Sequence, residues 1–237
     1  MIPFFNLINN FMRTCVILIF SLISICTSAQ EYFSETLDSL YREDQIYFGV
    51  TYNTLFNTPK AFTQTNFSPG FSAGVIRDFP INKKRNLALG LGLGYALNIY
   101  AQNLKITKIE NQGFVYDFVS SQNFSSNRFS LQALEIPFEF RWRTSNAINY
   151  KFWRLYLGVK ASYIFGSKSY FKSENQTLSY NDLDFNKWQY GMTLSVGYNN
   201  WNAFIYYGLN SIFNNAYFNS VPIEARSLKI GLIFYIL

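Results

Sequence analysis

The chain has 237 residues, a formal net charge of +6, 20% aromatic residues and no histidine. Its two cysteines, Cys15 and Cys26, both lie near the N-terminus. This composition excludes Ser-His and Cys-His nucleophilic sites and the usual zinc ligands. The basic residues are scattered, and they do not form the cluster that nucleic-acid binding requires. We therefore expect no enzymatic activity, no metal, no cofactor and no nucleic-acid partner.

The N-terminal segment has the pattern of a secretory signal peptide. A single charge, Arg13, precedes an apolar run from Cys15 to Cys26, and small residues follow as far as Ala29. The run is shorter than the ~20 residues that a membrane-spanning helix needs. A lipoprotein is the less favoured alternative, because the bulky Ile25 precedes Cys26. We predict export with cleavage after Ala29, which removes both cysteines.

The predicted organisation is a signal peptide over residues 1–29, a periplasmic leader over 30–45 and an outer-membrane β-barrel over 46–237. The leader is polar and acidic, with Leu37, Leu40 and Tyr41 at helical spacing. The simple interpretation is a short segment with one or two helical turns. The alternative is a docking segment for a periplasmic partner, which these three side chains would contact.

Eight segments of the barrel region alternate apolar with small or polar residues, which is the period of a β-strand. In chain order they lie near residues 46–53, 71–76, 87–100, 134–143, 153–165, 188–198, 203–210 and 226–237. The connections alternate between long and short. The first long one passes through Asn57, Pro59 and Asn66, and the other three cover residues 107–128, 173–186 and 214–224. This layout predicts an all-β fold: an eight-stranded antiparallel transmembrane up-and-down β-barrel with short periplasmic turns and longer extracellular loops.

The strand at residues 87–100 is the clearest of the eight. Leucines, Tyr95 and Ile99 alternate without a break with alanines, glycines and Asn98. Glycines at this density would cost a helix about 1 kcal/mol each relative to alanine. The segment also exceeds the roughly 9 to 11 residues that a tilted strand needs to cross a bilayer.

Alternation alone does not decide which face of the strands points inward, because a soluble barrel has apolar residues inside. The apolar faces supply roughly 40 large groups, too many for the interior of an eight-stranded barrel. We therefore expect large residues to face lipid and small or charged residues to face the lumen. Aromatic residues are expected to face outward at the two interfaces of the membrane: Trp142, Trp153, Trp201, Trp188, Tyr52, Tyr100 and Tyr170.

Seven charged residues fall on the inward face of the predicted strands. They are Glu135, Glu139, Arg141, Arg143, Arg154, Lys160 and Lys229. Because unpaired buried charge is costly, we expect a structural network of salt bridges that keeps the barrel rigid, with each glutamate matched to an arginine. An ion path is disfavoured because eight strands leave no open channel. Asp182 and Asp184 lack the 12-residue ligand pattern of a calcium loop and are interpreted as exposed loop carboxylates.

Four stretches of the chain resemble one known family. They read RNLALGLGLGYALN, LEIPFEFRWRTSNAINYKFWRLYLGVKASYIF, WQYGMTLSVGYN and GLIFYIL. In these stretches the chain resembles the PorT family, also called SprT, of Bacteroidota outer-membrane barrels. The resemblance implies a component of the type IX secretion system, which exports proteins with C-terminal sorting domains and is linked to gliding motility in some members. No catalytic residue is ascribed to the family.

The partners expected from this interpretation are outer-membrane lipid, other type IX secretion subunits and the barrel assembly machinery. Leu237 departs from the general barrel pattern, because it stands where a terminal aromatic often serves assembly recognition. A second function from a different class also fits the predicted fold. It is a free-standing OmpX-like structural or adhesive barrel whose Asn-rich outer loops bind surface ligands.

Overall fold

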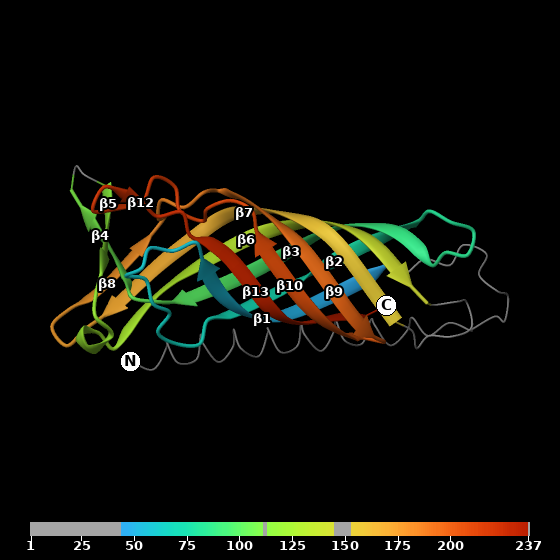
Figure 1. Cartoon of the computed structure of the whole chain (residues 1–237), viewed down its shortest axis with the longest axis horizontal. Coiled ribbons are helices and arrows are strands. Elements are labelled where there is room, and N and C mark those ends of the chain that lie inside the picture. The colour runs from blue at the N-terminus through green and yellow to red at the C-terminus, as the bar shows by residue number, and fades with distance from the viewer. Residues whose placement is uncertain (1–43, 111–112, 145–152, 237) are drawn as a thin grey trace, which may run out of the picture. The chain divides into compact units, whose positions relative to one another are not determined.

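The computed structural model describes residues 44–110, 113–144 and 153–236 (Figure 1). All of them belong to one compact unit, and its regular elements are strands apart from one 3-10 turn, η1 (Ser121–Asn123). No helix in this part of the chain is long and apolar enough to span a membrane. The predicted signal peptide, the docking residues Leu37, Leu40 and Tyr41, and the terminal Leu237 lie outside the described residues.

Eight long strands close into an antiparallel barrel, which confirms the predicted fold. They are β1 (Gln45–Phe56), β2 (Pro69–Pro80), β3 (Leu87–Ala101), β6 (Ser126–Arg143), β7 (Trp153–Lys172), β9 (Trp188–Tyr198), β10 (Trp201–Gly208) and β13 (Arg226–Ile236). Each strand pairs with the next in this order, and β13 returns to pair with β1, where Val50 lies opposite Leu232. The up-and-down order leaves no free edge along the wall of the barrel.

The long connections contain short strands that the sequence did not predict. They are β4 (Leu104–Ile109), β5 (Gly113–Phe118), β8 (Thr177–Asn181), β11 (Tyr217–Phe218) and β12 (Val221–Pro222). Two hairpins, β4–β5 and β11–β12, stand beside a long β6–β7 ribbon to which β8 is added. Figure 1 shows these elements gathered at the end of the barrel opposite the C-terminus. We call this end of the barrel the extracellular extension.

The strand signal in these connections is weak because their apolar residues are few and alternate with polar ones. In β4, the buried Leu104 and Ile106 alternate with Lys105 and Thr107, which gives a polar average over a short segment. β7 also contains a β-bulge, since Gln132 lies opposite Gly166 and Ala133 opposite Ile164, leaving an extra residue between them.

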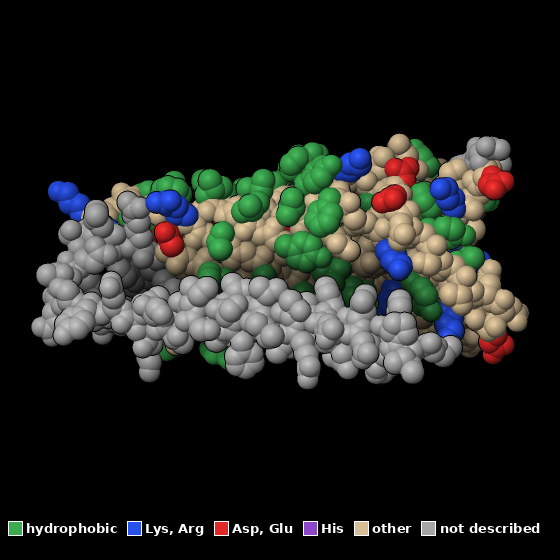
Figure 2. Space-filling view, turned by 180° about the vertical axis from the view of Figure 1, so that it is seen from behind, with side chains coloured by type: hydrophobic (Ala, Val, Ile, Leu, Met, Phe, Trp, Pro, Cys, Tyr) green, Lys and Arg blue, Asp and Glu red, His purple; other side chains and the backbone are tan. Residues whose placement is uncertain are grey.

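The outer face of the barrel is a belt of exposed apolar side chains, such as Phe48, Leu91 and Leu157. Figure 2 shows hydrophobic side chains over the middle of the barrel and Lys and Arg side chains toward its ends. Exposed apolar area on this scale is compatible with lipid and not with water. The four tryptophans are all exposed on this face, with Trp188 farther than the others from the short turns.

Tyr100 is the exception to the predicted outward aromatics. Its side chain is 3% exposed and points inward. The Tyr100 and Ser227 hydroxyl oxygens lie 2.7 Å apart as a hydrogen-bonded pair. The prediction was wrong because Tyr100 has the same strand phase as Ala96 and Asn98, which both face the interior.

Candidate functional site

The barrel interior holds all seven charged residues that the sequence placed there. β6 contributes Glu135, Glu139, Arg141 and Arg143, β7 contributes Arg154 and Lys160, and β13 contributes Lys229, and all of them are buried. They share one face because side chains two residues apart on a strand point the same way. The structure divides them into two ionic clusters.

The first cluster is centred on Asp78 of β2, which the sequence analysis missed. The Arg141 Nη1 and Asp78 Oδ1 atoms are 2.6 Å apart, and Arg143 Nη1 pairs with the second carboxylate oxygen of Asp78. The Nε of Arg141 also lies 3.0 Å from Glu139 Oε2. The alternation of β2 could have revealed Asp78, because Asp78 lies two residues beyond the inward-facing Ile76.

Tyrosine rings surround the first cluster. The Arg141 guanidinium carbon is 4.5 Å from the centroid of the Tyr156 ring and 5.5 Å from that of Tyr235. Cation–π contacts of this kind are favourable where water is excluded. The expectation that only small or charged groups face the lumen was therefore wrong, since Tyr47 and Tyr206 are also buried inside.

Glycines on the neighbouring strands make room for two of these tyrosines. A Cβ atom built on Gly94 of β3 would collide with the hydroxyl oxygen of Tyr47, and one on Gly191 of β9 would collide with the ring of Tyr206. The glycines of the predicted strand at 87–100 therefore have two roles. They maintain the alternation of large and small residues along the strand, and they leave space for side chains inside the barrel.

The second cluster joins Glu135 to two lysines. Lys160 Nζ lies 2.7 Å from Glu135 Oε2, and Lys229 Nζ lies 4.0 Å from Glu135 Oε1. Lys229 also sits 4.7 Å from the centroid of the Tyr206 ring. The expected arginine partner thus holds for Glu139 but not for Glu135. Glu135 is paired instead with Lys160 of the neighbouring strand β7 and with Lys229 of β13, which reaches it across the interior.

Little empty space remains beside the second cluster. The cavity bounded by Glu135, Lys160 and Lys229 has a volume of about 10 Å³, which is about the minimum for one water molecule. Both glutamates are held by basic side chains, so neither is arranged as a free acid or base for catalysis. The chemistry of the described interior is that of a packed ionic core.

The extracellular half of the interior is apolar. Phe129 is fully buried, and its ring centroid lies 5.0 Å from that of Tyr100, 5.1 Å from Phe185 and 5.8 Å from Phe213. Tyr116 of β5 packs at the edge of Phe213, and burial, with a smaller contribution from the charge of Asp184, raises the pKa of its hydroxyl. This aromatic core fills the mouth of the barrel.

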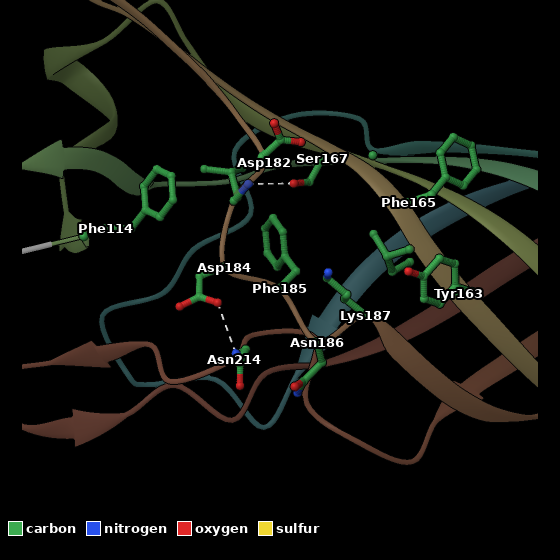
Figure 3. Close-up of a pocket in the computed structure, with 14 residues that line it drawn as sticks. Phe114, Tyr163, Phe165, Ser167, Asp182, Asp184, Phe185, Asn186, Lys187 and Asn214 are labelled. Carbon is green, nitrogen blue, oxygen red and sulfur yellow. Dashed lines mark hydrogen bonds between the residues drawn. The ribbon is translucent and has the colours of Figure 1, made fainter.

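An open groove of about 750 Å³ runs along the side of the extension (Figure 3). β7 forms one wall and the segment between β8 and β9 forms the other. The backbone amides of Asp182 and Leu183 donate to the Ser167 carbonyl and hydroxyl oxygens at 3.1 and 2.8 Å. Asn214 donates from its side-chain amide to Asp184 Oδ1 at 3.1 Å. In the part of the chain that the structure describes, no three His, Cys, Asp or Glu side chains are grouped to hold a metal ion.

Comparison with known proteins identifies the family. Residues 28–214 match the model of the family described as "Outer membrane protein beta-barrel domain". No curated protein matches the chain. Among solved structures, the chain is similar to Ail, the attachment invasion locus protein of Yersinia pestis, with 12% identity and a TM-score of 0.37 over 83% of this chain and 100% of that chain. The chain belongs to the outer membrane protein β-barrel domain family, on the strength of the family model that covers most of its length.

Proposed function

We propose that this barrel is a non-enzymatic outer-membrane component of the type IX secretion system, needed for export of proteins with C-terminal sorting domains. The observation that carries the proposal is the resemblance of the chain to the PorT family, above all over residues 134–165, which span parts of β6 and β7. The proposal extends to gliding motility, to which this secretion system is linked in some members of that family.

The packed interior supports an accessory role in secretion. Ionic clusters fill the membrane half of the barrel, and the aromatic core around Phe129 fills the extracellular half. An exported protein crossing the outer membrane through this barrel would need a wide lumen, which an eight-stranded barrel does not provide. The barrel therefore serves as an anchor that presents its leader and its extension to other subunits.

Gene deletion tests this function directly. Loss of the gene should leave cargo with C-terminal sorting domains inside the cell, and the full-length gene should restore its release into the medium. Quantitative mass spectrometry of the medium and of the cell fraction measures both amounts. Unchanged release in the deletion strain would refute the proposal and favour the free-standing OmpX-like barrel.

The leader is the proposed contact with a periplasmic partner. Replacing Leu37, Leu40 and Tyr41 by serine should reduce cargo release while the barrel still inserts, which heat-modifiable migration on gels reports. Replacing Ser34 and Ser39 by alanine is the matched control and should leave release unchanged. Affinity purification of the tagged protein from native outer membranes should recover secretion subunits with the unchanged leader and not with the serine variant.

A further inference from the structure

The outward faces of β6 and β7 change composition at the same height on the barrel. On β6, apolar residues from Trp142 to Leu134 give way to Gln132, Ser130 and Arg128. On β7, the apolar row ends at the bulge residue Phe165. The two transitions coincide because Gln132 lies opposite Gly166, the residue after Phe165.

Three exposed cations follow directly beyond this border. Arg128 lies opposite Tyr170, with Lys168 and Lys172 two residues away on either side of Tyr170 in β7. Side chains diagonally placed on neighbouring strands lie about 7–8 Å apart. The Arg128 guanidinium carbon is 5.4 Å from the centroid of the Tyr170 ring, which keeps it on the outer face. We call Arg128, Lys168 and Lys172 the cationic strip.

No carboxylate of the described residues neutralises the charge of the cationic strip. Among the described residues, no carboxylate lies within ion-pair distance of any of the three cations, although Glu174 and Asp182 flank β8 nearby. The interior cations Arg141 and Lys160 each have a carboxylate partner. The strip is therefore positioned to receive negative charge from outside the chain.

Hydrogen-bonding groups border the strip on two sides. The outward residues of β8, which pair with Lys168–Lys172, are Thr177, Ser179 and Asn181. The open groove begins at Ser167, the residue before Lys168, and its lining includes the amine of Lys187 (Figure 3). Hydroxyl and amide groups of this kind suit a sugar headgroup.

We propose that the cationic strip binds the phosphate groups of a phosphorylated, acylated saccharide of the outer leaflet, the class to which lipid A belongs. Its acyl chains would lie on the apolar belt that ends at Leu134 and Phe165, and its phosphates would meet Arg128, Lys168 and Lys172 directly above. Charge-assisted contacts between basic side chains and phosphate are short and strong, and cations beside an anionic membrane surface add to its attraction. This binding rests on the barrel and its orientation and does not depend on the secretion proposal.

Titration of the full mature chain in detergent micelles with diphosphorylated lipid A, followed by native mass spectrometry, tests the proposal. The variant R128Q/K168Q/K172Q should bind lipid A about 100-fold more weakly. The variant R77Q/K83Q/K84Q, which removes three cations at the short-turn end, is the matched control and should bind as the unchanged chain does. The charge-conserving variant R128K/K168R/K172R should retain binding. Heat-modifiable migration on gels verifies that every variant is folded.

Two lipid competitors separate phosphate recognition from general lipid contact. Lipid A without its phosphates should bind the unchanged chain far more weakly, and phosphatidylglycerol should compete poorly because it lacks the saccharide. Equal binding of dephosphorylated lipid A, equal competition by phosphatidylglycerol, full binding by R128Q/K168Q/K172Q, or an equal loss in R77Q/K83Q/K84Q would each overturn the proposal.

Discussion

The inward side chains of β6 are mainly charged in the membrane half of the barrel, from Glu135 to Arg143, and apolar in the extracellular half, from Phe129 to Ala133. The outward side chains of the same strand change in the opposite sense, from apolar to polar. The strand keeps one alternation of buried and exposed residues throughout. What changes is the solvent outside it, since lipid surrounds one half and water the other.

The two halves are consequently held together by different forces. In lipid, apolar side chains gain little by moving inward, so the interior is filled by ion pairs whose loss leaves buried charge. In the extracellular extension, burial of aromatic side chains away from water supplies the stability, as in a soluble protein. Substitutions in the two halves should therefore act through separate mechanisms.

The largest effect is expected for Asp78→Asn in the membrane half. The substitution preserves shape but removes the negative charge that Arg141 and Arg143 share, so we expect a loss of about 4 kcal/mol in the free energy of unfolding. Urea unfolding in detergent micelles, followed by tryptophan fluorescence, measures it. The exposed Asp117→Asn is the control and should change stability little. A loss below about 1 kcal/mol for Asp78→Asn would show that the ionic cluster does not hold this half together.

A somewhat smaller effect is expected for Phe129→Ala in the extracellular half. Removing this fully buried ring leaves a cavity among Tyr100, Phe185 and Phe213, at a cost of about 3 kcal/mol. The same unfolding experiment applies, with Phe67→Ala, at a side chain that is 69% exposed, as the control. Equal losses in the free energy of unfolding for Phe129→Ala and Phe67→Ala would show that the aromatic core does not stabilise the extracellular half.

Tyr100→Phe should have a modest effect. The change keeps the ring against Phe129 and removes only the buried hydrogen bond to Ser227, so we expect a loss of about 1 kcal/mol. Comparison with Phe129→Ala separates the polar and packing contributions in the extracellular half. A loss as large as that of Phe129→Ala would mean that the hydroxyl, and not the ring, is the main contact.

The smallest effect is the expected coupling between the two halves. Asp78 lies opposite Gly90 and Phe129 opposite Tyr100, and Gly90 and Tyr100 are ten residues apart on β3, or about 33 Å at the usual rise per residue. In a double-mutant cycle, the losses from Asp78→Asn and Phe129→Ala should add to within about 0.5 kcal/mol. A larger coupling energy would show that the halves form one cooperative core.

Local periodicity predicted the long strands because every second residue of a membrane strand meets lipid. β9 begins and ends at the predicted residues, Trp188 and Tyr198. Periodicity did not predict β8 or the β4–β5 hairpin, whose strands have few residues and a partly polar composition. Those elements depend on contacts with segments distant in the sequence, such as the T-shaped contact between Phe114 and Tyr180.

The interior positions of the seven charged residues follow from strand phase, but their partners do not. Glu135 and Lys160 are on neighbouring strands, so their ion pair could be predicted from the order of the strands in the sequence. The contact between Lys229 and Glu135 crosses the lumen and could not. The role of Asp78 depends on an ion pair between side chains of β2 and β6, two strands that are separated in the sheet by β3. Only the closed barrel shows which side chains meet across its interior.

The pairing of Asp78 with Arg141 and Arg143 has a consequence for biogenesis. β3 separates β2 from β6, so the carboxylate has no access to these arginines until the three strands β2, β3 and β6 have assembled. A hairpin of β1 and β2 that entered the bilayer alone would carry a bare anion into hydrocarbon, which is energetically costly. The chain should therefore enter the membrane with at least β2, β3 and β6 already paired, and sequential threading of single hairpins should be the slow route.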